Sequence, residues 1–225
     1  QNLFRPHRYI EPIFLLDARD PICLERVSNY SIGSHHNVSI IIPYLNESWA
    51  LANKTLRSIL QTTPDHLINE ILLIDDGNEP GNDSYDWGDR AVSLAPNKIK
   101  VHRNGKREGL IRSKNVGVAL SAAETLVFLE PHMIFNPGWL EPLLDALDDG
   151  HTIVAPHLDS LTEDYFLNGT TGYMLRPYTI GGFDFSFTFN WFAPPSSRDP
   201  NWETPDNFYT PAFSGGVFAV KKDEF

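Results

Sequence analysis

A carboxylate and an imidazole lie two positions apart, directly after a strongly apolar run. Thr125 to Leu129 has the composition of a buried strand, and Glu130-Pro131-His132 follows it. Residues two apart on an extended chain point to the same side, so Glu130 and His132 can converge on one ligand. An oxygen donor combined with a neutral imidazole suits a transition metal such as manganese better than calcium. The same residue types are common at solvated strand ends, so the triplet alone predicts either a metal site or an ordinary strand terminus.

Two further predicted strands end in residues that can bind a ligand or form a turn. Val38 to Pro43 is β-branched and buried by composition, and Tyr44 follows it. Glu70 to Gly77 is a second such strand and contains Asp75 and Asp76. Aspartate at this place can cap a turn or accept hydrogen bonds from a nucleobase or ribose. Since ligands bind at the carboxyl ends of parallel strands, we expect both strand ends and the Glu-Pro-His triplet to meet at one edge.

Three cations surround the expected start of a helix. Arg107, Arg112 and Lys114 lie beside or within residues 110–120, whose apolar spacing predicts a helix. A solvated helix face would explain them. A helix N-terminus with arginines nearby is equally suited to a diphosphate, because its backbone N–H groups and the guanidinium groups attract negative charge.

The elements that must position these residues alternate along the chain. Apolar spacing predicts helices over residues 48–61, 110–120 and 137–147, and apolar runs predict strands over 38–43, 70–77, 98–102, 125–129 and 152–155. Residues 78–87 read as a polar loop, and residues 1–36 as an extended arm. This order is typical of an α/β protein with a mainly parallel sheet. Further on, the alternation of Phe183, Phe185, Phe187, Phe189 and Trp191 predicts a strand that covers a sheet or lines a groove.

Composition excludes several classes of partner. The chain has 225 residues, a net charge of −11 and a pI near 5.1, which argue against nucleic acid or an anionic membrane as the main partner. It has no apolar run long enough to span a membrane. Cys23 is the only cysteine, so no internal disulfide is possible. Six Asn-x-Ser/Thr triplets, beginning at Asn29, Asn37, Asn46, Asn53, Asn82 and Asn168, favour the secretory pathway. The chain opens on Gln and closes within an expected helix, so we expect it to be part of a longer protein.

Several stretches, in order, resemble the polypeptide N-acetylgalactosaminyltransferases, which initiate mucin-type O-glycans. The most specific is REGLIRSK, residues 107–114, and the similarity covers residues 38–225. The other matching stretches are Asn46-Glu47, residues 64–67, 70–76, 138–144 and 181–183, and residues 215–219. The resemblance implies a GT-A glycosyltransferase fold over residues 37–225, with a mainly parallel sheet flanked by helices and a Rossmann-like nucleotide-binding half.

The resemblance also implies an activity and a location. Members of this family transfer N-acetylgalactosamine from UDP-GalNAc to Ser or Thr of a polypeptide, with retention of configuration and with Mn²⁺ as cofactor. They are Golgi enzymes, so the expected location is the Golgi lumen. The expected parent is a type II membrane glycoprotein whose anchor lies outside this segment.

Position by position, the resemblance assigns roles to individual residues. Glu130 and His132 would hold the metal. The nucleotide would contact the backbone at Pro43 and its neighbour Tyr44, the side chains of Asp76 and Arg107, and the backbone at Pro131. The donor sugar would lie against Gly215 and Gly216, with Lys114 nearby, because glycine lets a ligand approach the main chain.

The sequence departs from the family pattern at two of these places. The family's metal motif is Asp-x-His, whereas this chain has Glu130, which carries one more methylene. Pro43 stands where the family has threonine. The family's Trp-Gly-Gly-Glu segment, third metal ligand, catalytic loop and lectin domain have no counterpart in this chain, so the catalytic residues are not assigned.

Three hypotheses follow from the sequence. The first is a retaining, metal-dependent transferase that uses UDP-GalNAc and a polypeptide acceptor. The second is an inverting UDP-sugar transferase, which needs a carboxylate base directed at the acceptor hydroxyl. The third is a non-catalytic relative that serves as a binding module, motivated by the change from Asp to Glu at position 130.

Overall fold

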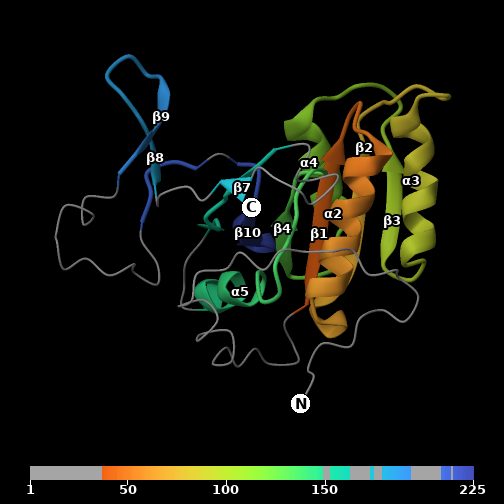
Figure 1. Cartoon of the computed structure of the whole chain (residues 1–225), viewed down its shortest axis with the longest axis horizontal. Coiled ribbons are helices and arrows are strands. Elements are labelled where there is room, and N and C mark those ends of the chain that lie inside the picture. Colours follow the sequence, from red (N-terminus) through yellow and green to blue (C-terminus); the bar gives the residue numbers. More distant parts are fainter. Residues whose placement is uncertain (1–36, 149–152, 163–172, 175–178, 194–208, 214) are drawn as a thin grey trace.

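A six-stranded sheet forms the centre of the molecule (Figure 1). The structure is a computed structural model, and it describes residues 37–148, 153–162, 173–174, 179–193, 209–213 and 215–225. The strands lie in the order β3 (Ile99–Arg103), β2 (Ile68–Asp75), β1 (Val38–Tyr44), β4 (Thr125–Phe128), β10 (Phe218–Lys221) and β5 (Ile153–Val154). The first four of these run parallel, and β10 is antiparallel to β4 and β5. The predicted α/β class with a mainly parallel sheet is therefore confirmed.

Helices cover both faces of this sheet. They are α2 (Trp49–Thr62), α3 (Asp83–Leu94), α4 (Leu110–Leu120) and α5 (Glu141–Asp148), with short 3₁₀ turns η1 (Asp65–Leu67) and η3 (Lys222–Glu224). Two small antiparallel pairs complete the described structure: β6 (Ser160–Leu161) with β7 (Tyr173–Met174), and β8 (Ile180–Phe183) with β9 (Phe189–Phe192). Among the described residues, no helix combines the length and the apolar composition that crossing a membrane requires.

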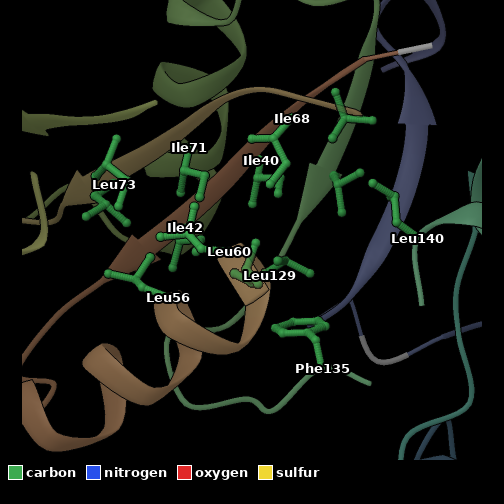
Figure 2. Close-up of a cluster of buried hydrophobic side chains, with 14 of the residues drawn as sticks. Ile40, Ile42, Leu56, Leu60, Ile68, Ile71, Leu73, Leu129, Phe135 and Leu140 are labelled. Atoms are coloured by element: carbon green, nitrogen blue, oxygen red, sulfur yellow. The ribbon is translucent and has the colours of Figure 1, made fainter. Parts of the chain in front are cut away.

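The central strands are apolar on both faces because both faces are covered. Ile40 and Ile42 of β1 pack in one cluster with Leu56 of α2, as Figure 2 shows. Ile41 points to the opposite face, where α4 lies. Gly117 of α4 rests directly on Ile41, and a Cβ at this position would overlap the isoleucine side chain. Strand β1 is thus held between two helices, which fixes the position of its carboxyl end.

Helix α3 contradicts the polar loop predicted over residues 78–87. The helix begins at Asp83, and the side chain of Asn82 caps it by accepting a hydrogen bond from the Ser84 amide at 3.0 Å. Its inner face buries Trp87 and Ala91, whereas its outer face carries the Asp and Arg side chains. The prediction was wrong because the charged outer face and the early glycines concealed a single apolar stripe.

Two other expectations need correction. Helix α5 begins at Glu141 rather than at residue 137, and Gly138 adopts a left-handed φ of 74° that ends any helical path. The aromatic alternation over residues 183–191 is not one strand but the hairpin of β8 and β9. Its turn is held by Asp184, whose carboxylate accepts hydrogen bonds from the backbone N–H groups of Ser186 and Thr188. The predicted arm over residues 1–36 lies outside the described residues.

A buried carboxylate ties the opposite, amino-terminal edge of the sheet together. Glu70 of β2 is 1% exposed. Its Oε1 accepts hydrogen bonds from Ser39 of β1 at 2.8 Å and from the Ala122 amide at 2.7 Å. Its Oε2 pairs with Lys100 of β3 at 2.6 Å. Burial disfavours the charged form, but these hydrogen bonds outweigh burial and hold the pKa of Glu70 below its usual value.

We therefore expect Glu70→Gln to destabilise the fold in a pH-dependent way. At pH 7 the free energy of unfolding should fall by about 1.5–3 kcal/mol, because a charge-assisted buried hydrogen bond is lost. A carboxyl group whose pKa is depressed by folding stabilises the protein above its unfolded pKa of about 4.3. That contribution disappears as the pH falls through the folded pKa, so the difference between wild type and variant should shrink on acidification.

Urea unfolding at neutral and at acidic pH measures this difference. Glu124→Gln is the matched control, because the Glu124 side chain is exposed just before β4. The stabilising role of the Glu70 carboxylate is refuted if Glu70→Gln and Glu124→Gln have the same free energy of unfolding. It is also refuted if the difference in this free energy between Glu70→Gln and wild type is independent of pH.

Candidate metal and nucleotide site

The carboxyl ends of β1, β2 and β4 meet at one edge of the sheet. Strand β1 lies between the other two and pairs in parallel with both. This arrangement brings Tyr44, the Asp75-Asp76 pair and the turn that starts at Glu130 to the same edge, as the sequence predicts.

His132 lies between two carboxylates at this edge. Its Nε2 is 3.2 Å from Glu130 Oε2, and its Nδ1 is 3.1 Å from Glu47 Oε2. The hydrogen bonds that the imidazole donates to Glu130 and Glu47 raise the pKa of His132 to about 10, against the effect of partial burial. In turn, His132 holds the pKa of Glu130 below its usual value. The structure thus brings together both predicted metal ligands and adds Glu47, which the sequence analysis did not assign to the site.

The geometry of the Glu130 and His132 pair fits a divalent metal ion. Two adjacent ligands at about 2.1 Å in an octahedral site lie about 3.0 Å apart, close to the observed separation of 3.2 Å between Nε2 and Oε2. With a metal on Nε2, the Nδ1–H would donate to Glu47, which is the usual way that a carboxylate orients a ligating imidazole. In the part of the chain that the structure describes, no three His, Cys, Asp or Glu side chains are grouped to hold one ion together. The described chain therefore offers two ligands and one orienting carboxylate.

Two hydroxyl groups on α2 hold the turn that carries His132. Thr55 is fully buried, and its Oγ1 donates to the Pro131 carbonyl at 2.8 Å and accepts from the Met133 amide at 2.9 Å. One turn further along α2, Ser58 Oγ accepts from the Phe135 amide at 3.3 Å. Sequence analysis missed these residues. The available signal was the presence of Thr55, Ser58 and Thr62 on the buried face of an amphipathic helix, where apolar side chains are expected.

Helix α3 holds the main chain at Glu47. The Glu47 carbonyl accepts hydrogen bonds from Trp87 Nε1 at 3.0 Å and from Ser84 Oγ at 2.5 Å. The preceding amide, of Asn46, donates to Asn78 Oδ1 at 2.8 Å. The main chain on both sides of the Glu47 side chain is thereby fixed by residues that follow β2. Helix α3, which the sequence analysis missed, therefore helps to position this carboxylate.

Asp76 anchors the segment that leads into α4. Its carboxylate accepts hydrogen bonds from the amides of Glu108 and Gly109, from Ser113 Oγ and from Asn104 Nδ2, at distances of 2.8–3.1 Å. Burial disfavours its charged form, but these hydrogen bonds prevail and lower its pKa. The predicted contact of Asp76 with a nucleotide stays a prediction. In the structure its side chain holds in place the loop that carries Arg107.

A cavity of about 650 Å³ opens at the ends of β1 and β2. It is lined by Leu45, Asn46, residues 77–82 and Arg107. Gly77 has a left-handed φ of 85°, and a Cβ there would lie 2.5 Å from the Arg107 amide, so only glycine allows this loop to pass so closely. Arg107 is exposed and borders the cavity, as expected of a ligand-binding cation.

The other predicted nucleotide residues are buried and do not line this cavity. Tyr44 is 2% exposed and its ring packs on Trp87 at a centroid distance of 4.0 Å. Burial, followed by the nearby Asp75 carboxylate, raises the pKa of Tyr44 far above its usual value. Pro43 and Pro131 are also buried. The side chains of these three residues face the interior, so any contact that they make with a nucleotide has to involve their main chain.

The predicted donor-sugar residues lie beside the Glu130 and His132 pair. Lys114 Nζ donates to the Gly215 carbonyl at 2.6 Å, and burial lowers its pKa against the opposing charge of Glu130. A Cβ built on Gly216 would be 2.8 Å from Glu130 Oε1. The structure therefore brings Lys114, Gly215 and Gly216 next to the candidate metal ligands, although they come from distant parts of the sequence.

Comparison with solved structures identifies a similar fold. Over 84% of this chain and 35% of the other, it matches a structure described as GalNAc-T7 with UDP, GalNAc and Mn²⁺, with a TM-score of 0.71 and 26% sequence identity. The fold is accordingly of the GT-A type predicted from the sequence.

Sequence comparison gives the same result. The chain is 35% identical over 213 residues to the inactive polypeptide N-acetylgalactosaminyltransferase-like protein 5 of Mus musculus, covering 93% of this chain and 47% of the relative. It is 34% identical over 224 residues to polypeptide N-acetylgalactosaminyltransferase 4 of Mus musculus, covering 97% and 36%. The chain spans less than half the length of these curated relatives. Residues 39–219 match the model of glycosyl transferase family 2, and the chain belongs to this family, with the resemblance to polypeptide N-acetylgalactosaminyltransferases confirmed.

Proposed function

We propose that this chain is the nucleotide-binding part of a metal-dependent glycosyltransferase that uses UDP-GalNAc. The observation that carries the proposal is the pairing of Glu130 with His132 at 3.2 Å, at the sheet edge where the cavity bordered by Arg107 opens. A similar solved structure was obtained with UDP, GalNAc and Mn²⁺, which supports the choice of ligand and ion. The acceptor we propose is Ser or Thr of a polypeptide, in keeping with the names of the sequence relatives.

Each residue of the site has a distinct task in this proposal. A bound Mn²⁺ would supply Lewis-acid stabilisation of the negative charge on the leaving diphosphate. Glu130 and His132 would hold the ion, and Glu47 would fix the tautomer and direction of the imidazole. The amides of Glu108 and Gly109, which precede α4, already donate to Asp76, and the phosphate contact is assigned to the exposed Arg107 side chain that borders the cavity.

Retention of configuration and a Golgi location belong to the same proposal. The described residues provide the proposed nucleotide site, and the whole protein is proposed to be a type II membrane protein of the Golgi. An inverting mechanism is the alternative, and the anomer of the product distinguishes the two. A non-catalytic binding module is the third possibility, favoured by the Glu130 variant of the metal motif and by the similarity to a relative described as inactive.

The first prediction of the proposed function concerns nucleotide selectivity and Arg107. With manganese present, UDP should bind more tightly than ADP or GDP. Arg107→Ala should weaken UDP binding about tenfold or more, since charge-assisted hydrogen bonds contribute about 1.5–3 kcal/mol. Its melting temperature without ligand should stay nearly unchanged, because the Arg107 side chain is exposed. Calorimetry gives the affinities.

Arg112→Ala is the matched control for this prediction. Arg112 is an exposed arginine in the first turn of α4 that pairs with Glu108. Equal affinity for the three nucleotides would refute the proposed base specificity. A strongly destabilised Arg107→Ala protein with unchanged UDP affinity would show that the residue is structural.

The second prediction concerns the metal. UDP affinity should rise with added manganese, and by linkage manganese affinity should rise by the same factor when UDP is bound. His132→Ala should abolish this mutual increase, whereas His66→Ala, at an exposed position in η1, should not. Glu130→Asp should preserve or strengthen it. If manganese leaves UDP affinity unchanged in both wild type and Glu130→Asp, Glu130 and His132 do not form a metal site. The binding-module alternative is then favoured.

The third prediction tests the support of the metal turn. Thr55→Val removes the hydroxyl that joins α2 to Pro131 and Met133 while keeping the shape of the side chain. It should lower the free energy of unfolding by about 1–3 kcal/mol, the cost of unpaired buried polar groups, and should also reduce the manganese effect on UDP affinity.

Thr62→Val provides the comparison for Thr55→Val. Thr62 is a buried threonine of the same helix whose hydroxyl donates to the Ser58 carbonyl, within the helix. Thr62→Val should change stability but not the manganese effect. The same loss of manganese coupling in both variants would show that it arises from general destabilisation of α2.

A further inference from the structure

The carboxylate of Glu130 lies flat against Gly216. A Cβ built on Gly216 would be 2.8 Å from Oε1, 3.0 Å from Cδ and 3.4 Å from Oε2. All three heavy atoms of the carboxyl group therefore occupy the space where a side chain at position 216 would begin. Gly216 does not have the left-handed backbone conformation of Gly215, so the reason for glycine at this position is space rather than φ.

Neighbouring groups hold the carboxylate in this position. His132 Nε2 lies 3.2 Å from Oε2. Lys114 attracts Glu130 electrostatically while its Nζ is bound to the Gly215 carbonyl at 2.6 Å. A metal shared by Glu130 and His132 would hold the carboxylate at the same place, because the same Oε2 would be the ligand.

The length of the side chain decides whether this space is filled. An aspartate at position 130 has one methylene fewer, which withdraws the carboxylate from Gly216 by about one C–C bond of ~1.5 Å. The family resemblance places aspartate here and a donor sugar over the Gly215-Gly216 pair. In this chain the face of Gly216 is already covered, by the residue that also serves as a candidate metal ligand.

We propose that Glu130 is a specificity-determining residue: its carboxylate covers Gly216, so this chain binds a nucleoside diphosphate more tightly than the corresponding nucleotide sugar. The inference rests on the proposed nucleotide and metal site and deepens it. The sugar has to displace the carboxylate from Gly216, and this displacement also disturbs the pairing of Glu130 with His132.

Calorimetry with UDP and with UDP-GalNAc, both with manganese, tests the proposal. In the wild type, UDP should bind about tenfold more tightly than UDP-GalNAc, which is the usual effect of a misfit of one methylene in a binding pocket. In Glu130→Asp, UDP-GalNAc should bind at least as tightly as UDP, because the shorter carboxylate no longer covers Gly216. Glu124→Asp, the same shortening at an exposed position before β4, should leave the wild-type preference unchanged.

A second variant tests the contact from the other side. Gly216→Ala places a Cβ where the carboxylate lies, so the half-exposed Glu130 side chain has to move away from its hydrogen bond with His132, with little effect on the melting temperature. The manganese effect on UDP affinity should then decrease. In the double variant Glu130→Asp with Gly216→Ala the manganese effect should return, because the shorter carboxylate leaves room for the methyl group. This non-additivity is expected of residues in direct contact.

The outcomes separate this inference from the proposed function. A wild type that binds UDP with manganese but prefers UDP-GalNAc, or a preference that Glu130→Asp leaves unchanged, overturns the inference alone. A folded wild type that binds neither ligand overturns the proposed nucleotide site and the inference with it. A preference for UDP that reverses in Glu130→Asp supports both.

Discussion

The imidazole of His132, held between the carboxylates of Glu47 and Glu130, is the interaction on which the rest of the site depends. Each carboxylate faces a different ring nitrogen, so the ring has one orientation in which Nε2 points towards Glu130. With this orientation, Nε2 and Glu130 Oε2 are spaced as two adjacent ligands of one ion. If Glu47 were absent, the ring could turn, and the spacing that defines the metal site would no longer be fixed.

The fold supplies this geometry from several directions. Parallel pairing of β1 with β2 and β4 brings three strand ends to one edge. Thr55 holds the turn that carries His132, and Trp87 holds the main chain of Glu47. Gly216 provides the space for the carboxylate of Glu130. The buried hydroxyl groups of Thr55, Ser58 and Ser84 are thus explained by the site, because apolar side chains at these positions would leave both segments without these hydrogen bonds.

The helices and strands that were predicted correctly are those whose sequence pattern is formed by neighbouring residues. Helix α4 was predicted at its observed bounds, and the three central strands were predicted to within a few residues, because apolar runs and helical spacing are properties of neighbouring residues. The candidate metal pair was also accessible, since Glu130 and His132 are only two positions apart, just after β4. Glu47 and Thr55 were not, because their partners lie 85 and 76 residues away and the contacts exist only once the sheet has formed. Helix α3 was missed for a different reason, because charged residues separate the few apolar residues of its buried stripe.

The central claim is that the imidazole of His132 binds Mn²⁺ through Nε2 when UDP is present. Pulsed electron paramagnetic resonance of the Mn²⁺–UDP complex of this chain tests it most directly, since the method detects a nitrogen nucleus bound to the ion. The account predicts one nitrogen coupling of the imidazole type, present in the wild type and in Glu130→Asp and absent in His132→Ala. A complex that contains Mn²⁺ and UDP but has no imidazole coupling in the wild type would contradict it.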